Sequence, residues 1–167
     1  IKEITKKNYL QAGFPSPSIQ KYENILLNHN YTVVIVEHVT PQPNPERAVT
    51  RVVSPGTSLS NYNKRESNFL MSVFIEKISY VNSDNYIVGL TTMDVSTGKN
   101  YLHSILNYIE DSYSWRDEIG RYIHYYNPSE IIFHSKNMEL TTDTIIQYWD
   151  ISHNSIQINL YKDNVFH

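Results

Sequence analysis

Cysteine is absent from this chain of 167 residues, which excludes a disulfide framework and a thiolate metal site. Long apolar runs are absent as well, since none approaches the roughly 18 residues that a membrane-spanning helix requires. The first residues do not form a signal peptide. We therefore expect an intracellular protein, in the cytoplasm, the nucleus, an organelle or encoded by a virus, with no membrane partner.

Glycine is scarce, with five residues, and none of them lies in a nucleotide-binding loop. That loop requires Gly-x-x-x-x-Gly-Lys followed by Ser or Thr. The nearest approach is Gly98-Lys99-Asn100, which lacks the leading glycine and the hydroxyl. The seven histidines show no metal-ligand spacing. We therefore expect neither a cofactor nor a metal ion in this chain.

The net charge is low, at −3, and it is unevenly divided. Residues 1–57 hold six Lys or Arg against four Asp or Glu, whereas residues 58–167 hold eight against thirteen. A DNA duplex is a dense line of negative charge, so the first part is the better candidate to face it. Neither part carries the basic stripe that is typical of an autonomous DNA-binding domain.

β-Branched residues and prolines organise residues 31–57. Two β-branched runs, 33–36 and 49–53, flank a loop with three prolines, and Ser-Pro-Gly-Thr follows at 54–57. This pattern predicts strand, long loop, strand and turn. Before it, Ser16 or Ser18 can cap a helix that should pack on the first strand. The apolar positions of this helix are Ile19, Tyr22, Ile25 and Leu26.

The same stretch resembles the end of the mismatch-recognition domain of the MutS family of DNA mismatch repair proteins. The matching pieces are residues 12–15 (Ala-Gly-Phe-Pro), 34–37, 47–49 (Arg-Ala-Val) and 53–57 (Val-Ser-Pro-Gly-Thr). This sequence departs from the family pattern at His38, where Gln is usual, at Ala48 for Glu and at Ser54 for Thr. The Glu37-His38 pair, together with the heavy use of Tyr, Asn and Ile, suggests a divergent branch, such as a viral or organellar one.

Residues 67–167 read as three strands, a helix, a strand, a helix and a strand. The strands are expected at 69–80, 86–95, 99–105, 131–133 and 156–160, with turns at 82–85 and 97–98. The helices are expected at 114–126, with a capping box of Ser114 and Asp117, and at 142–149. The apolar run 131–133 predicts a central strand covered on both faces. This order is that of a ribonuclease H-like mixed sheet with flanking helices.

The connector domain of MutS proteins has that fold, and residues 90–98 (LTTMDVSTG) are similar to its hairpin. The chain is therefore predicted to be of the α/β class with an α+β N-terminal piece. We predict the rear of the recognition domain at 1–58, a polar linker at 59–66 and the connector domain at 67–167. Because the chain starts at Ile1 rather than Met, we expect a piece of a larger protein.

The resemblance implies a parent protein that binds mismatched double-stranded DNA and signals through an ATPase. ATP and Mg²⁺ are expected for that parent only, along with dimer formation and docking of a MutL-like protein on the connector. The family's mismatch sensor, Phe-x-Glu, lies upstream of the matched segment. Phe14 does not replace it, because no Glu stands two residues later. This chain alone is therefore not expected to be an enzyme.

Cations near the recognition segment are candidates to contact the DNA backbone, since such contacts require only a positive charge. These candidates are Lys6, Lys7, Arg47 and Arg51. The alternative is a solvated surface, with Arg51 paired to Glu37 or Glu46. His38 could donate and accept in a buried network as Gln would. The positions expected to shape the fold through the family motifs are Gly13, Pro15, Glu37, His38, Pro55, Gly56, Thr57, Asp94 and Gly98.

Two other functions are compatible with the pattern. A metal-dependent nuclease on the same fold would need clustered carboxylates, and Asp94, Glu76, Asp117 and Glu118 are available. However, the strand at 131–133 is followed by His134 and Ser135 where such nucleases place an acid. The other alternative is a module that binds only protein through residues 58–167.

Overall fold

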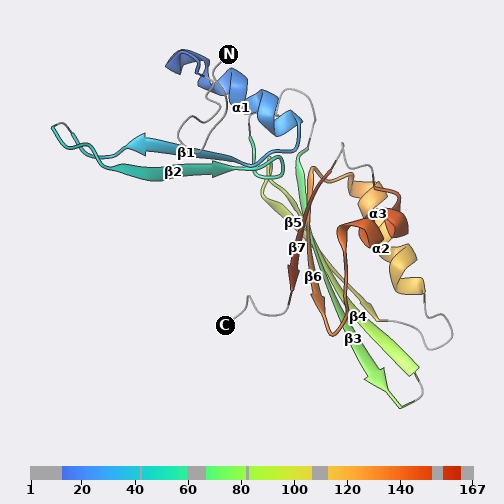
Figure 1. Ribbon diagram of the computed structural model, residues 1–167. Helices are drawn as coiled ribbons and strands as arrows, with labels where there is room; N and C mark the ends of the chain where they lie inside the picture. The colour runs from blue at the N-terminus through green and yellow to red at the C-terminus, as the bar shows by residue number, and fades with distance from the viewer. Residues whose placement is uncertain are drawn as a thin grey trace, which may run out of the picture.

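The computed structural model describes residues 13–41, 43–59, 67–81, 83–106, 113–151 and 156–162, which form two sheets and accompanying helices (Figure 1). Among these residues, no helix is long and apolar enough to span a membrane. In chain order the elements are η1 (Ser16–Ser18), α1 (Ile19–Asn28), β1 (Val33–His38), β2 (Arg47–Val53), β3 (Phe69–Tyr80), β4 (Ser83–Asp94), β5 (Lys99–Leu106), α2 (Ser114–Tyr126), β6 (Glu130–Lys136), α3 (Thr142–Trp149) and β7 (Gln157–Lys162).

The N-terminal sheet is an antiparallel hairpin of β1 and β2, with α1 beside it. The predicted strand, loop, strand and turn are confirmed. A bulge shifts the register where Ile35 is followed by Val36, so Ile35 pairs with Arg51 and Val36 pairs with Val49. Pro17 lies in the short helix η1 that leads into α1, and Ser18 at the N-cap makes no side-chain capping bond.

The buried face of α1 differs from the predicted one. Ile19, Tyr22, Ile25 and Leu26 remain 38–42% exposed, whereas Glu23 and Leu27 are buried. Glu23 can be buried because Arg51 donates a hydrogen bond to its carboxylate at 2.5 Å. The buried side of α1 therefore combines one apolar residue, Leu27, with an ion pair that compensates the burial of Glu23.

The second sheet has five strands in the order β5-β4-β3-β6-β7. β3 pairs antiparallel with β4, β4 with β5 antiparallel, and β6 and β7 are parallel to β3. This is the strand order of a ribonuclease H-like fold, as the element order predicted.

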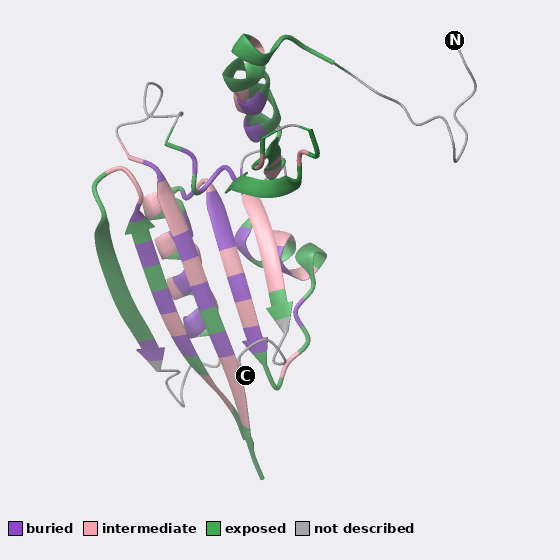
Figure 2. Ribbon diagram, turned by 90° about the vertical axis from the view of Figure 1, so that its left-hand side faces the viewer, coloured by how far each residue is buried: buried purple, intermediate pink, exposed green. Residues whose placement is uncertain are grey.

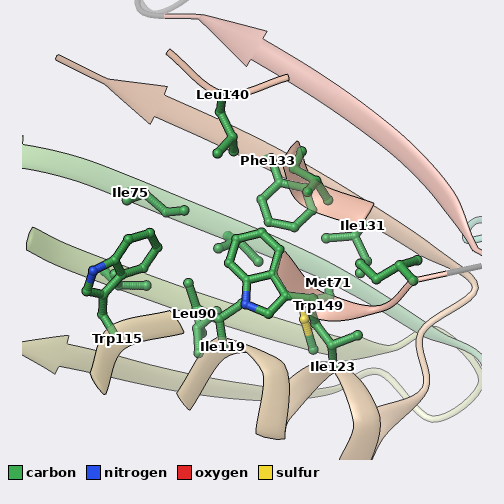
Figure 3. Packing of buried hydrophobic residues seen from close by; sticks show 14 of the residues in the cluster. Met71, Ile75, Leu90, Trp115, Ile119, Ile123, Ile131, Phe133, Leu140 and Trp149 are labelled. Atoms are coloured by element: carbon green, nitrogen blue, oxygen red, sulfur yellow. The ribbon is translucent and has the colours of Figure 1, made fainter. Parts of the chain in front are cut away.

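The core lies between this sheet and the helices α2 and α3 (Figure 3). Met71, Val73 and Ile75 alternate along β3 and are fully buried. The predicted stripe of α2 is confirmed, with Trp115, Ile119 and Ile123 buried and with Tyr122 and Tyr126 packed at the margin of the core.

Both helices cover the same face of the sheet, so the prediction that the central strand is covered on both faces is wrong. The connections from β5 to β6 and from β6 to β7 run between parallel strands and advance in the same direction along the sheet. Right-handed crossovers of this kind place both helices on one side. In Figure 2 the opposite face of the five-stranded sheet turns toward the viewer, with many half-buried and exposed residues.

Two local predictions are also wrong. Ser114 is the first helical residue of α2 rather than its cap; Tyr113 is the N-cap and makes no side-chain capping bond. The turn predicted at 82–85 is tighter, because β4 begins at Ser83 and pairs with Tyr80. The helix end before Pro128 is confirmed, with Asn127 in the left-handed conformation that ends a helix.

Candidate functional site: a buried joint between the two sheets

The chain leaves the N-terminal hairpin through the turn at 54–57, which is largely buried against the five-stranded sheet. Pro55 and Gly56 are buried, and the turn is closed by the Thr57 hydroxyl, which accepts a hydrogen bond from the Ser54 backbone N–H at 2.9 Å. These are the residues of the Pro-Gly-Thr motif. The turn therefore serves as a packed contact, and we call the contact that it makes with the second sheet the joint.

Glu130, at the start of β6, is the centre of the joint. It is 5% exposed. One carboxylate oxygen accepts the Gly56 backbone N–H at 3.0 Å, and the other accepts the Asn159 side-chain amide at 2.5 Å. A buried carboxylate is costly unless both oxygens are satisfied, so these donors fix the position of the turn on the sheet.

Asn68 holds the same turn from the other side. Its side-chain amide donates to the carbonyl oxygens of Pro55, Gly56 and Ser58 at 3.0–3.2 Å. Its own carbonyl accepts the Val95 N–H at 2.9 Å. Asn68 therefore ties the turn after β2 to the turn that follows β4.

The other strand of the hairpin is tied to the sheet as well. The Gln157 side-chain amide, at the start of β7, donates to the Thr32 hydroxyl at 3.0 Å, just before β1 begins. Gln157 also lies 3.5 Å from the Asn159 side-chain oxygen. Both strands of the hairpin are thus attached at their bases to the same end of the five-stranded sheet.

Asp94 closes the turn after β4 and is buried. Its carboxylate accepts the Ser96 backbone N–H at 3.0 Å and the Thr97 hydroxyl at 2.8 Å. Burial alone would raise the pKa of Asp94, but the bonds from Thr97, Ser96 and the Asn68 backbone together hold that pKa below its usual value. Gly98 completes the turn at a φ of +73°, where a side chain would be strained.

Replacing Asp94 with asparagine should lower the free energy of unfolding by about 1.5 kcal/mol at pH 7, because the amide keeps one acceptor and loses a charge-assisted bond. The folded pKa is depressed, so this stability is present above the unfolded pKa of about 3.9 and is lost as the pH falls through the folded pKa. Urea unfolding at pH 7 and pH 3 checks this. A difference between the two proteins that is equal at both pH values would contradict it.

Arg47 and Arg51, predicted as DNA contacts, lie on opposite faces of the hairpin. Arg51 pairs with Ile35 on the α1 side, and its guanidinium bonds Glu23 rather than the predicted Glu37 or Glu46. Arg47 is exposed and pairs with His38 at the far end of the hairpin. Lys6 and Lys7 lie outside the described residues. The predicted cations therefore do not form a single patch within the described part of the chain.

The remaining motif positions in the N-terminal part are exposed. Gly13 has open space around it, and the Pro15 carbonyl accepts the Ser18 N–H at 2.8 Å as η1 begins. Glu37 and His38 are exposed at the end of β1, so the expected buried network around His38 is not formed. A two-stranded sheet has no buried interior at its far end, so the end of β1 cannot bury these two side chains.

The four acids of the nuclease hypothesis are not brought together. Asp94 uses both carboxylate oxygens in its own turn, Glu76 pairs with Lys136 at 2.8 Å, and Glu118 pairs with Arg121 at 3.0 Å. Asp117 is exposed in the first turn of α2. Within the described residues, no group of three or more His, Asp or Glu side chains is placed to hold a metal ion.

The sequence alone did not reveal Glu130, Asn68 or Asn159. The only signal was a glutamate and an asparagine placed directly before apolar strand runs, at 130 and 68. The groups that they bind lie 10 to 74 residues away in the chain, and pattern analysis does not connect such positions.

Comparison with known proteins gives a consistent result. Residues 2–62 match the family profile of MutS domain I. The chain is 31% identical over 160 residues to a DNA mismatch repair mutS homolog of Acanthamoeba polyphaga mimivirus, covering 92% of this chain and 14% of that protein. It is 27% identical over 180 residues to the DNA mismatch repair protein MutS of Staphylococcus carnosus, covering 99% of this chain and 19% of that protein.

A mitochondrial DNA mismatch repair mutS homolog of Sarcophyton glaucum is 28% identical over 134 residues, covering 79% of this chain and 12% of that protein. The chain thus spans less than a fifth of the length of these relatives. Among solved structures, Marinitoga piezophila Argonaute with a 5′ OH guide RNA overlays with a TM-score of 0.37 at 17% identity, over 59% of this chain and 17% of that one. T. thermophilus RuvC with a Holliday junction substrate overlays with a TM-score of 0.33 at 7% identity, over 56% and 64%.

Proposed function

Because this chain belongs to the MutS family of DNA mismatch repair proteins, we propose that it is the region of a larger protein where binding of mismatched duplex DNA is coupled to the rest of the molecule. In this proposal, residues 1–58 are the rear of the mismatch-recognition domain and residues 67–167 are the connector domain. The ATPase that responds to the DNA lies elsewhere in the parent protein, with its ATP and Mg²⁺.

The joint is the observation that supports this proposal most directly. Coupling between two sites requires a physical contact that has a defined geometry in each state. The turn at 54–57, which follows β2, is held by Glu130 on one side and by Asn68 on the other, and Gln157 holds Thr32 just before β1 begins. A displacement of the hairpin therefore acts directly on the starts of β6 and β7.

In this proposal, the hairpin side of the chain faces the duplex. Arg47 is exposed and is available for a phosphate contact, whereas the guanidinium of Arg51 already bonds Glu23. Phosphate contacts of this kind add affinity without reading sequence. A mismatch makes DNA easier to kink, so part of the discrimination would come from deformability. Dimer formation and a MutL-like partner are expected of the parent protein.

The test is Glu130→Gln in the full-length protein that carries this segment. Gln keeps the volume of Glu but brings an N–H₂ group toward Gly56 or Asn159, both of which donate, so one bond of the joint is lost. We expect binding of a mismatched duplex to change less than about threefold, while stimulation of the ATPase by that duplex falls by about tenfold. Fluorescence anisotropy and a phosphate-release assay measure the two quantities.

The matched control is Glu46→Gln, the same chemical change at an exposed position. It should alter neither quantity. Full stimulation in Glu130→Gln would end the proposed role of the joint. A wild-type protein that binds matched and mismatched duplexes equally, with no stimulation by either, would overturn the proposed function itself.

A further inference from the structure

One edge of the five-stranded sheet is unusually open. β5 pairs with β4 along its whole length, from Lys99 opposite Asp94 to Leu106 opposite Ile87, and among the described residues no strand pairs with its other side. An edge strand of this length presents a row of unpaired backbone N–H and C=O groups. Figure 2 shows this strand exposed at the margin of the sheet.

β5 lacks the features that normally protect an edge. It contains no proline, its register with β4 is continuous without a bulge, and its one charged residue, Lys99, stands at its start. Leu102, in the middle of the strand, is 80% exposed. By contrast, the hairpin strand β2 carries Arg47, Arg51 and a bulge. Charges, prolines and bulges prevent strand addition, and of these β5 has only the charge of Lys99 at its start.

A hollow lined by tyrosines adjoins this edge. The Tyr101 ring of β5 lies 5.4 Å from that of Tyr126, which also contacts Tyr122 and Tyr125 of α2. Arg121 and the three tyrosines of α2 line a hollow of about 200 Å³. Small-molecule sites usually measure roughly 300–1,000 Å³, so this hollow suits one large apolar side chain.

Arg121, Lys99 and Glu118 together give this corner one net positive charge, whereas the surrounding part of the chain is acidic. Arg121 is 72% exposed at the rim, and Lys99 is exposed at the start of β5. The carboxylate of Glu118 forms an ion pair with the Arg121 guanidinium at 3.0 Å and lies 3.7 Å from the His103 ring nitrogen. Residues 58–167 carry five more acidic than basic residues as a whole. An incoming segment with negative charge is therefore favoured at this corner.

We infer that β5 accepts an extended, acidic segment of a partner protein as a sixth strand, with an apolar or aromatic side chain of that segment in the tyrosine hollow. Backbone hydrogen bonds along β5 would supply affinity, and the hollow and Arg121 would supply specificity. This inference goes beyond the proposed function, since it requires neither DNA binding nor an intact joint.

The probe is a synthetic eight-residue peptide in which Asp or Glu alternates with Val or Phe, and the control peptide carries Lys at every acidic position. Hydrogen exchange at the β5 amides of the 167-residue chain should slow when the acidic peptide is added and should not slow with the control peptide. By fluorescence anisotropy, Arg121→Glu and Tyr125→Ala should each weaken binding by about tenfold. Tyr80→Ala changes an exposed tyrosine at the end of β3, beside the turn into β4, and should leave peptide binding unchanged.

Three results would overturn the inference. The first is no binding of the acidic peptide at millimolar concentration, and the second is protection at β7 or on the open face instead of β5. The third is a dimer in sedimentation together with slowed exchange at β5 in the absence of peptide, because the occupant of the edge would then be a second copy of the chain. Slowed exchange at β5, with binding that Arg121→Glu and Tyr125→Ala each weaken by about tenfold and that Tyr80→Ala leaves unchanged, would support it.

Discussion

Replacing Phe133 with alanine is expected to lower the free energy of unfolding by about 3–5 kcal/mol. Phe133 lies on β6 at the middle of the core and is fully buried, with its ring stacked on Trp149 at 5.3 Å. Both the lost apolar burial and the cavity that remains contribute to the cost, because the surrounding sheet and helices relax only in part. Urea denaturation followed by tryptophan fluorescence measures it, and Trp149 reports directly on the change.

Phe74→Ala is the matched control. Phe74 lies on the adjacent strand β3, opposite Gly89, but faces the side of the sheet without helices and is 37% exposed. Its removal should cost less than half as much as that of Phe133. Equal losses for the two changes would mean that the open face is covered as firmly as the helix face, and would contradict the one-sided core described above.

Gly56→Ala is the second change with a large expected effect, a loss of about 3 kcal/mol. A Cβ atom at this position would lie 2.6 Å from the Glu130 Cβ and 2.7 Å from its carboxylate oxygen. Overpacking of this kind costs about 1–3 kcal/mol. The displaced Glu130 would also lose the Gly56 N–H, which leaves a buried polar group unsatisfied. Thermal and urea unfolding of the 167-residue chain measure the loss.

Gly13→Ala provides the comparison, because no atom lies within 4 Å of the site of its Cβ. Its effect should stay within about 0.5 kcal/mol. If the steric account is correct, Gly56→Ala and Glu130→Gly should be strongly non-additive, since glycine at position 130 removes both the Cβ and the carboxylate that the new Cβ would meet. Additive losses in that double-mutant cycle would show that the cost of Gly56→Ala arises elsewhere.

Much of the five-stranded sheet could be predicted from the sequence because its signals are local. Period-two burial at Met71, Val73 and Ile75 and period-3.6 burial at Trp115, Ile119 and Ile123 depend only on residues close in the chain. The side on which the helices pack could not be predicted from such periods. It follows from strand order and crossover handedness, which are properties of the whole sheet.

The site was only half predictable. The family motif drew attention to Pro55, Gly56 and Thr57, but nothing in their neighbourhood pointed to Glu130, which lies 74 residues from Gly56. The face of α1 was predicted wrongly for a related reason. Hydrophobic spacing favoured Ile19 and Tyr22, whereas a single distant cation, Arg51, made burial of Glu23 favourable. Pairs that neutralise buried charge are tertiary features that a periodicity does not contain.

The two sheets are connected twice, and the two connections are physically different. The first is the peptide chain between Leu59 and Ser67, and the second is a pair of hydrogen bonds, from the Gly56 backbone N–H to the Glu130 carboxylate and from the Gln157 amide to the Thr32 hydroxyl. The attachment of the hairpin to the five-stranded sheet therefore depends on these hydrogen bonds and not on the number of residues between 59 and 67. Insertions or deletions between 59 and 67 should therefore change the free energy of unfolding far less than the loss of the Glu130 carboxylate does.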